Sequence, residues 1–172
     1  MSLIEPQLTS SVRQDWETPQ DLFDKLNEIH DFDIDAAATM ATKKCHVYMG
    51  PDHEEEDMVD ALGRGWGEVL FDPSCTGAIW LNPPYGRDIR KWMDKAYEES
   101  RRPGVTVVVL TFARTDTRWW HEVVSKAAEV RLLKGRVKFL QDGKVLAPAP
   151  APSALITFAG WSEGPPVVKF GL

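Results

Sequence analysis

The chain has 172 residues and a formal net charge of −6, with 43% hydrophobic and 27% charged residues. This length suits one domain with one core, and no apolar run approaches the length that spans a bilayer, so we expect no membrane role. The net negative charge argues against tight, non-specific binding to nucleic acid, because Lys and Arg supply that affinity. Basic residues nevertheless recur between Arg87 and Lys138, so the composition is compatible with a local basic face.

The N-terminus carries neither the basic start nor the apolar block of a signal peptide, which predicts a cytoplasmic protein. The two cysteines, Cys45 and Cys75, fit reduced thiols. Together with the histidines they lack the paired spacing of a zinc site, so we expect no metal. Residues 1–14 are predicted to be flexible, and residues 15–172 to form a single domain.

The first predicted helix covers residues 18–30, with Thr18 as its cap and Pro19 at its first helical position. Apolar side chains then recur at helical spacing. Residues 31–39 alternate apolar and acidic side chains before they turn small, which predicts a short strand followed by a tight loop that starts at Asp35.

Beyond this loop, strands alternate with helices. Residues 104–112 form an apolar run typical of a central strand in a parallel sheet, and residues 87–102 place apolar side chains on one helical face. The alternation predicts an α/β fold with a mostly parallel sheet and helices on both faces. Ligands of such sheets bind outside the carboxyl ends of the strands, where Asp35 and Asn82 are expected. The other predicted elements are strands at 47–48, 78–81, 129–133, 136–140 and 153–158, a helix at 117–128 and an extended connector at 147–152.

The segment IWLNPPYG, residues 79–86, ends a buried-type strand with an amide, two prolines and an aromatic residue. The prolines fix the backbone and disfavour helix there. An exocyclic amine of a nucleobase is a weak nucleophile, and two acceptors aimed at its N–H bonds would polarise it. The side-chain oxygen of Asn82 and the carbonyl of Pro83 suit that role, and Tyr85 would stack on a base taken out of the duplex. A rigid turn with a partly buried tyrosine is the alternative.

LNPPYG resembles the (D/N/S)PP(Y/F/W) motif of amino-methyltransferases, which move a methyl group from S-adenosylmethionine to a nitrogen of adenine, cytosine or glutamine. Further segments appear in the order seen in phage-type DNA N6-adenine methyltransferases, over residues 15–159. These segments are DWETPQDLFDKLN, FDIDAAAT, DALGRGW, LTFARTDTRWWHE, LLKGRVKF and APSALITF.

The resemblance implies a Rossmann-like class I methyltransferase fold and transfer of a methyl group to N6 of adenine in DNA. S-adenosylhomocysteine would be the product, no metal would be needed, and the setting would be a phage or a restriction–modification system. The implied catalytic residues are Asn82, Pro83, Pro84 and Tyr85. The implied cofactor-binding residues are Trp16, Thr18, Pro19, Asp35, Ala36, Ala37 and Asn82. The implied DNA-binding residues are Arg114, Arg118, Trp119 and Arg136.

Several of these assignments have a second interpretation from the residues themselves. Relatives usually carry a glycine in the loop after the first strand, where this chain reads Asp-Ala-Ala-Ala. Arginines at 114–118 fit a solvated loop as well as a phosphate site, and residues 134–139 fit a β-turn.

Among the acids at 52–60, Asp60 is the candidate for binding ribose hydroxyls. Loops at 50–77 and 141–152 are expected to recognise the target.

Three alternative functions stay open. Protein-glutamine methyltransferases also hold an amide nitrogen with Asn-Pro-Pro-Tyr, and cytosine N4 methylation is a nearer variant. A binding module without activity would fit the net charge of −6 and the glycine-free loop. The basic segments 114–118 and 134–138, together with the length of the similarity to the DNA N6-adenine methyltransferases, favour adenine in DNA as the methyl acceptor.

Overall fold

The structure is a computed structural model that describes residues 16–70, 72–160 and 164–172, so the prediction for residues 1–14 lies outside the described residues. Its strands fall into one large sheet and one small hairpin. The strands are β1 (Ile34–Asp35), β2 (Val47–Tyr48), β3 (Ala78–Leu81), β4 (Thr106–Phe112), β5 (Glu129–Leu132), β6 (Leu140–Gln141), β7 (Lys144–Val145), β8 (Ser153–Ala159) and β9 (Val167–Phe170).

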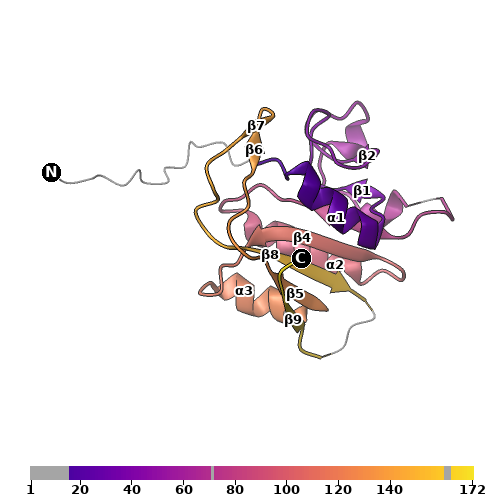
Figure 1. The fold of residues 1–172 in the computed structure, drawn as a ribbon. Helices are drawn as coiled ribbons and strands as arrows, with labels where there is room; N and C mark the ends of the chain where they lie inside the picture. Colours follow the sequence, from indigo (N-terminus) through magenta and orange to yellow (C-terminus); the bar gives the residue numbers. More distant parts are fainter. Residues whose placement is uncertain (1–15, 71, 161–163) are drawn as a thin grey trace.

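The large sheet has seven strands in the order β2-β1-β3-β4-β8-β5-β9 (Figure 1). Neighbours pair in parallel, except that β8 runs antiparallel to both β4 and β5. The hairpin β6–β7 stands apart from this sheet and is joined to residue Glu17 by a bridge at Leu140. The carboxyl ends of β1, β2 and β3 therefore lie along one edge.

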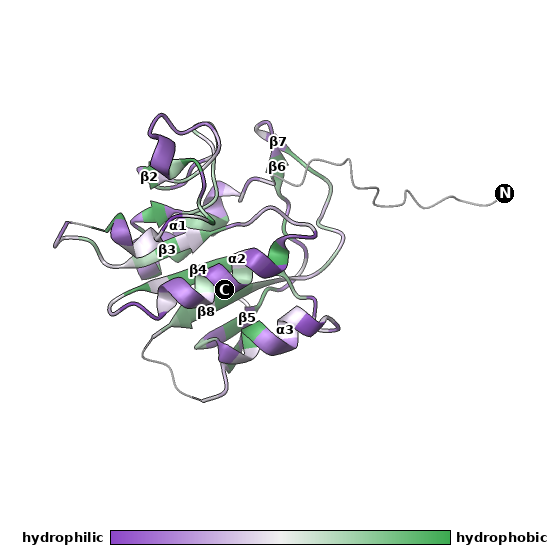
Figure 2. Cartoon of the chain, turned by 180° about the vertical axis from the view of Figure 1, so that it is seen from behind, coloured by the Kyte–Doolittle hydropathy of each residue, from purple (hydrophilic) through white to green (hydrophobic). Residues whose placement is uncertain are grey.

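Helices cover both faces of the sheet (Figures 1 and 2). Helix α1 (Gln20–His30) packs on one face, and α2 (Ile89–Ser100) and α3 (Arg118–Val123) pack on the other. A 3-10 turn, Val124–Lys126, follows α3, and two more lie at Glu56–Met58 and Trp66–Glu68. The mostly parallel α/β fold predicted from the sequence is confirmed.

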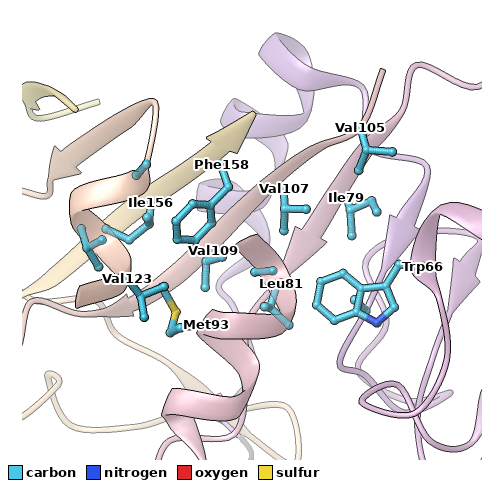
Figure 3. Close-up of a cluster of buried hydrophobic side chains, with 14 of the residues drawn as sticks. Trp66, Ile79, Leu81, Met93, Val105, Val107, Val109, Val123, Ile156 and Phe158 are labelled. Carbon is cyan, nitrogen blue, oxygen red and sulfur yellow. The ribbon is translucent and has the colours of Figure 1, made fainter. Parts of the chain in front are cut away.

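The central strand β4 is buried on both faces, which explains the continuous apolar run in its sequence. Val107 and Val109 point into the cluster beneath α2 and α3, which Figure 3 shows, while Val108 and Leu110 point into the cluster beneath α1. All four side chains are at most 1% exposed. A strand buried on both faces has no solvated side, so it shows no alternation with polar residues.

A buried carboxylate ties the end of α2 to the 3-10 turn Trp66–Glu68. Glu99 is 4% exposed and accepts hydrogen bonds from Lys95 Nζ at 2.7 Å and from the Gly67 amide at 3.1 Å, with Arg102 Nε at 3.2 Å. Burial alone would raise the pKa of Glu99, but these donors and charges outweigh it and lower the pKa.

Two local predictions were wrong. Pro19 is the N-cap of α1 and not its first helical residue, no side-chain hydrogen bond caps the helix, and Thr18 lies buried at the wall of a cavity. Residues 136–140 form no sheet strand, and only Leu140 enters a ladder. The carbonyls of Val137 and Phe139 instead accept the amides of Ala149 and Leu146 from the connector that follows the hairpin.

Among the described residues, no helix is long and apolar enough to cross a membrane.

Candidate active site

A cavity of about 590 Å³ opens at the carboxyl ends of β1, β2 and β3. Its wall is built from the loops that leave these strands, from the segment before α1, and from the tip of the β6–β7 hairpin. The residues that the sequence reasoning proposed and that line it are Trp16, Thr18, Asp35, Ala37, Asn82, Pro84 and Asp60. Parallel sheets place ligands at this edge, so the cavity is the candidate cofactor site.

Asp35 is the last residue of β1 and is 3% exposed. Its Oδ2 accepts the Lys44 amide at 3.0 Å and its Oδ1 accepts the Ala37 amide at 3.4 Å. Burial raises the pKa of Asp35 to about 6, and the two amides together with the charge of Lys44 hold it from rising further. A carboxylate in such surroundings is stabilised by a cationic ligand.

Gly50, which the sequence reasoning did not single out, lets the loop after β2 pack against the loop after β1. A Cβ at this position would lie 1.6 Å from the carbonyl oxygen of Ala38. The loop after β1 itself reads Asp-Ala-Ala-Ala, and the glycine that permits the close approach faces it from the loop after β2. The signal was the Gly-Pro step that begins two residues after the short strand predicted at 47–48.

Two further acids line the cavity, Asp52 and Asp60. Asp52 accepts the Met40 amide with both carboxylate oxygens, at 3.2 and 2.9 Å. Asp60 accepts the Leu62 amide with Oδ1 at 3.1 Å. Each carboxylate retains acceptor capacity beyond these bonds, so both are available to a ligand with hydroxyl groups.

Asn82 follows β3, and its side chain is held at both ends of the amide. Its Nδ2 donates to the carbonyl oxygen of Trp16 at 2.5 Å, and its Oδ1 accepts from the hydroxyl of Tyr85 at 3.0 Å. Because a backbone carbonyl only accepts, the Trp16 contact determines which end of the amide is the NH2 group. The amide oxygen of Asn82 is therefore oriented before any substrate binds.

Tyr85 is packed inside an aromatic cluster and does not line the cavity. Its ring stacks on Phe112 with centroids 4.5 Å apart, and Trp16 and Phe139 lie at 5.6 and 5.7 Å. The hydroxyl of Tyr85 also lies 3.2 Å from the carbonyl oxygen of Leu110. Burial raises the pKa of Tyr85, so the hydroxyl stays protonated and acts as a donor.

The structure does not bring every proposed site residue to the cavity. Ala36 is fully buried in the core, Pro83 is buried, and Pro19 lines a second cavity rather than this one. Gln141 and Gly143, at the tip of the hairpin, do line the candidate cofactor site, although the sequence reasoning assigned that loop only to target recognition. Hairpin residues could not be placed there from local sequence patterns.

The proposed DNA-binding residues lie in different surroundings, and only Arg114 has a contact with the aromatic cluster among those found in the described residues. Arg114 is exposed and its guanidinium lies 5.6 Å from the ring centroid of Phe112. Arg118 is exposed on α3, with Glu122 at 4.0 Å, whereas Trp119 is partly buried against the core. Arg136 is exposed and lines the second cavity.

Metal-binding geometry is not found in the described part of the chain. None of its groups of His, Cys, Asp or Glu side chains is arranged to hold a metal ion.

The seven-stranded α/β sheet, with a cavity at the carboxyl ends of its parallel strands, defines a Rossmann-like fold of the methyltransferase type. Residues 5–164, nearly the whole chain, match the family described as DNA N-6-adenine-methyltransferase (Dam). The chain belongs to this family, which confirms the resemblance noted from its motifs. Family membership implies DNA as the substrate and, as for methyltransferases generally, S-adenosylmethionine as the donor. A comparison with curated proteins finds no match.

Proposed function

We propose that this protein transfers a methyl group from S-adenosylmethionine to N6 of adenine in DNA, using Asn82, Pro83, Pro84 and Tyr85 on a base turned out of the duplex. The observation that carries the proposal is the oriented amide of Asn82, which lines the candidate cofactor site. The family match supports the reaction, and the site geometry supports the roles of the residues.

The residues around the cavity fit S-adenosylmethionine by their chemistry. Asp35 suits the ammonium group of the cofactor's amino-acid part, and Asp52 and Asp60 suit ribose hydroxyls. Trp92 and Met49 give apolar surface for a flat ring. When bound, S-adenosylmethionine supplies a methyl group that its sulfonium has already activated.

The side-chain oxygen of Asn82 would polarise the adenine amine by accepting a hydrogen bond from one of its N–H groups, with the Pro83 carbonyl as the second acceptor. The hydroxyl of Tyr85 has one proton and two acceptors within reach, Asn82 Oδ1 and the Leu110 carbonyl. When the amine donates to Asn82, the hydroxyl can donate to Leu110 instead, so no buried group loses its partner.

Base stacking on Tyr85 requires movement of Trp16. The Tyr85 ring is 8% exposed, and Trp16, the partly exposed member of the cluster, lies against it. An adenine that stacks on Tyr85 would take the place of the Trp16 indole, and one aromatic contact would replace another. Arg114, Arg118, Trp119 and Arg136 would contact the DNA around this point.

The test is to incubate the protein with S-adenosylmethionine and unmethylated DNA, digest the DNA to nucleosides and quantify N6-methyladenine. Asn82→Ala is expected to remove the product, while S-adenosylmethionine binding is weakened but still measurable in calorimetry, because Asn82 is one of many residues that line the cavity. Asn27→Ala is the matched control, because Asn27 also accepts a hydrogen bond with its amide oxygen, from the Phe32 amide, but lies in α1 outside the cavity.

Other products would redirect the proposal. N4-methylcytosine would keep the mechanism and change the base. Binding of S-adenosylmethionine without any methylated base would refute DNA methylation, and a protein-glutamine assay would then separate a protein methyltransferase from an inactive binding module.

A further inference from the structure

We propose that a second cavity of about 640 Å³, here called the basic groove, holds the sugar-phosphate backbone of DNA next to the target base. The inference rests on the proposed function and adds the surface that the DNA strand follows. The groove lies between residues 133–140 and the start of α1, and Lys134, Arg136 and Lys138 line it.

The three cations of the basic groove are exposed, and none forms an ion pair with a described residue. By contrast, Arg90 on the other side of the sheet is bonded to both Asp94 and Glu122. Among the described residues that line the groove, Asp21 carries the one acidic side chain, so the side chains of the lining have a net positive charge. In a chain with net charge −6, such a local excess is where a polyanion can bind.

The other walls of the basic groove suit a sugar rather than a bare ion. Aliphatic side chains lie between the cations, and the first turn of α1, which lacks a side-chain cap, forms the opposite wall. A backbone of alternating sugars and phosphates presents both kinds of surface. The aliphatic members of the lining are Leu22, Leu133, Val137, Leu140, Val145 and Leu172.

The segment that carries these cations also contacts the catalytic motif. Phe139, between Lys138 and Leu140, is 1% exposed, and its ring lies 5.7 Å from that of Tyr85 and 5.4 Å from that of Trp16. Its carbonyl accepts the Leu146 amide at 2.8 Å. The segment that lines the basic groove is therefore packed against the aromatic cluster that would receive the flipped base.

Several cations along one groove favour an extended polyanion over a single phosphate. An acidic peptide is the competing occupant, but a groove that shares a segment with Phe139 and Tyr85 serves the DNA that delivers the base. The site thus explains how an acidic protein of this family binds DNA: the positive charge is concentrated where the strand passes.

The experiment compares two triple variants that lose the same charge. Lys134→Ala, Arg136→Ala and Lys138→Ala empty the basic groove of cations. Lys91→Ala, Arg101→Ala and Lys126→Ala, the control, remove exposed cations of α2 and of the turns after α2 and α3. Binding to a short labelled duplex is followed by fluorescence anisotropy over a range of salt concentrations, and S-adenosylmethionine binding by calorimetry.

The groove variant should bind DNA at least roughly tenfold more weakly, and the slope of log K against log salt should fall by up to about 2.7, which corresponds to three lost phosphate contacts. S-adenosylmethionine binding should not change in either variant. Arg136→Ala alone should give about a third of the slope change. This single variant provides the measurement if the triple variant folds poorly.

The outcomes separate this inference from the proposed function. If the groove variant and the control bind DNA equally while the wild type methylates adenine, the groove assignment is wrong and the methyltransferase assignment stands. If the wild type neither binds nor methylates DNA, both are wrong. Tighter binding of an acidic peptide than of DNA, lost in the groove variant, would replace DNA with a protein partner.

Discussion

Asp35 should make the stability of this protein depend on pH in a direction opposite to that of most acids. Burial raises the pKa of this carboxyl from its ordinary value of 3.8 to about 6. The folded state therefore holds the proton more tightly than the unfolded state, and the stability that this provides is present at low pH and lost as the pH rises through 6. This rise in pKa corresponds to about 3 kcal/mol in the free energy of unfolding. About 2 kcal/mol of it is lost as the pH increases from 4 to 7.

The assay is urea denaturation, followed by tryptophan fluorescence, of the wild type and Asp35→Asn across this pH range. The asparagine cannot ionise, so the free energy of unfolding of the variant should gain about 2 kcal/mol relative to the wild type between pH 4 and pH 7. Asp24→Asn, an exposed carboxyl, is the control and should follow the wild type. Parallel profiles for the wild type and Asp35→Asn would refute the reasoning.

Three further substitutions test the packing, two at the site and one at the end of α2. Gly50→Ala should lower the melting temperature and weaken S-adenosylmethionine binding in calorimetry, because the added Cβ lies 1.6 Å from the Ala38 carbonyl oxygen; unchanged binding would show that the two loops separate freely. Glu99→Gln should cost about 3 kcal/mol in urea denaturation, because two cations lose their buried partner, and a variant as stable as the wild type would contradict this. Trp16→Ala should cost about 2 kcal/mol, since the indole contacts three aromatic rings but is partly exposed; no loss of stability would mean that Trp16 does not belong to the Tyr85 cluster.

Local sequence patterns predicted an element correctly where the burial of its side chains depends on that element alone. The strand at 78–81 matches β3 residue for residue, and the helix predicted at 87–102 contains α2. Their apolar spacing reflects direct contact with the core, which is a property of a few consecutive residues.

The same patterns were misleading at the edges of the fold. Strand β9 was not predicted, since all four of its residues are exposed at the sheet edge and show no alternation. The strand predicted at 136–140 has a suitable composition, but its backbone partners come from the connector after the hairpin. Pairing with a distant segment, rather than propensity, determined both results.

The sequence by itself determined the alternation of strands and helices and the Asn-Pro-Pro-Tyr turn at the end of a strand, because periodicity and proline geometry act within a few residues. Only the tertiary structure placed the Trp16 carbonyl on the Asn82 amide, across 66 positions of the chain, and Gly50 against Ala38. It also brought Lys134, Arg136 and Lys138 to one groove beside the start of α1. Contacts between segments far apart in the chain depend on how the elements pack, and no local pattern encodes them.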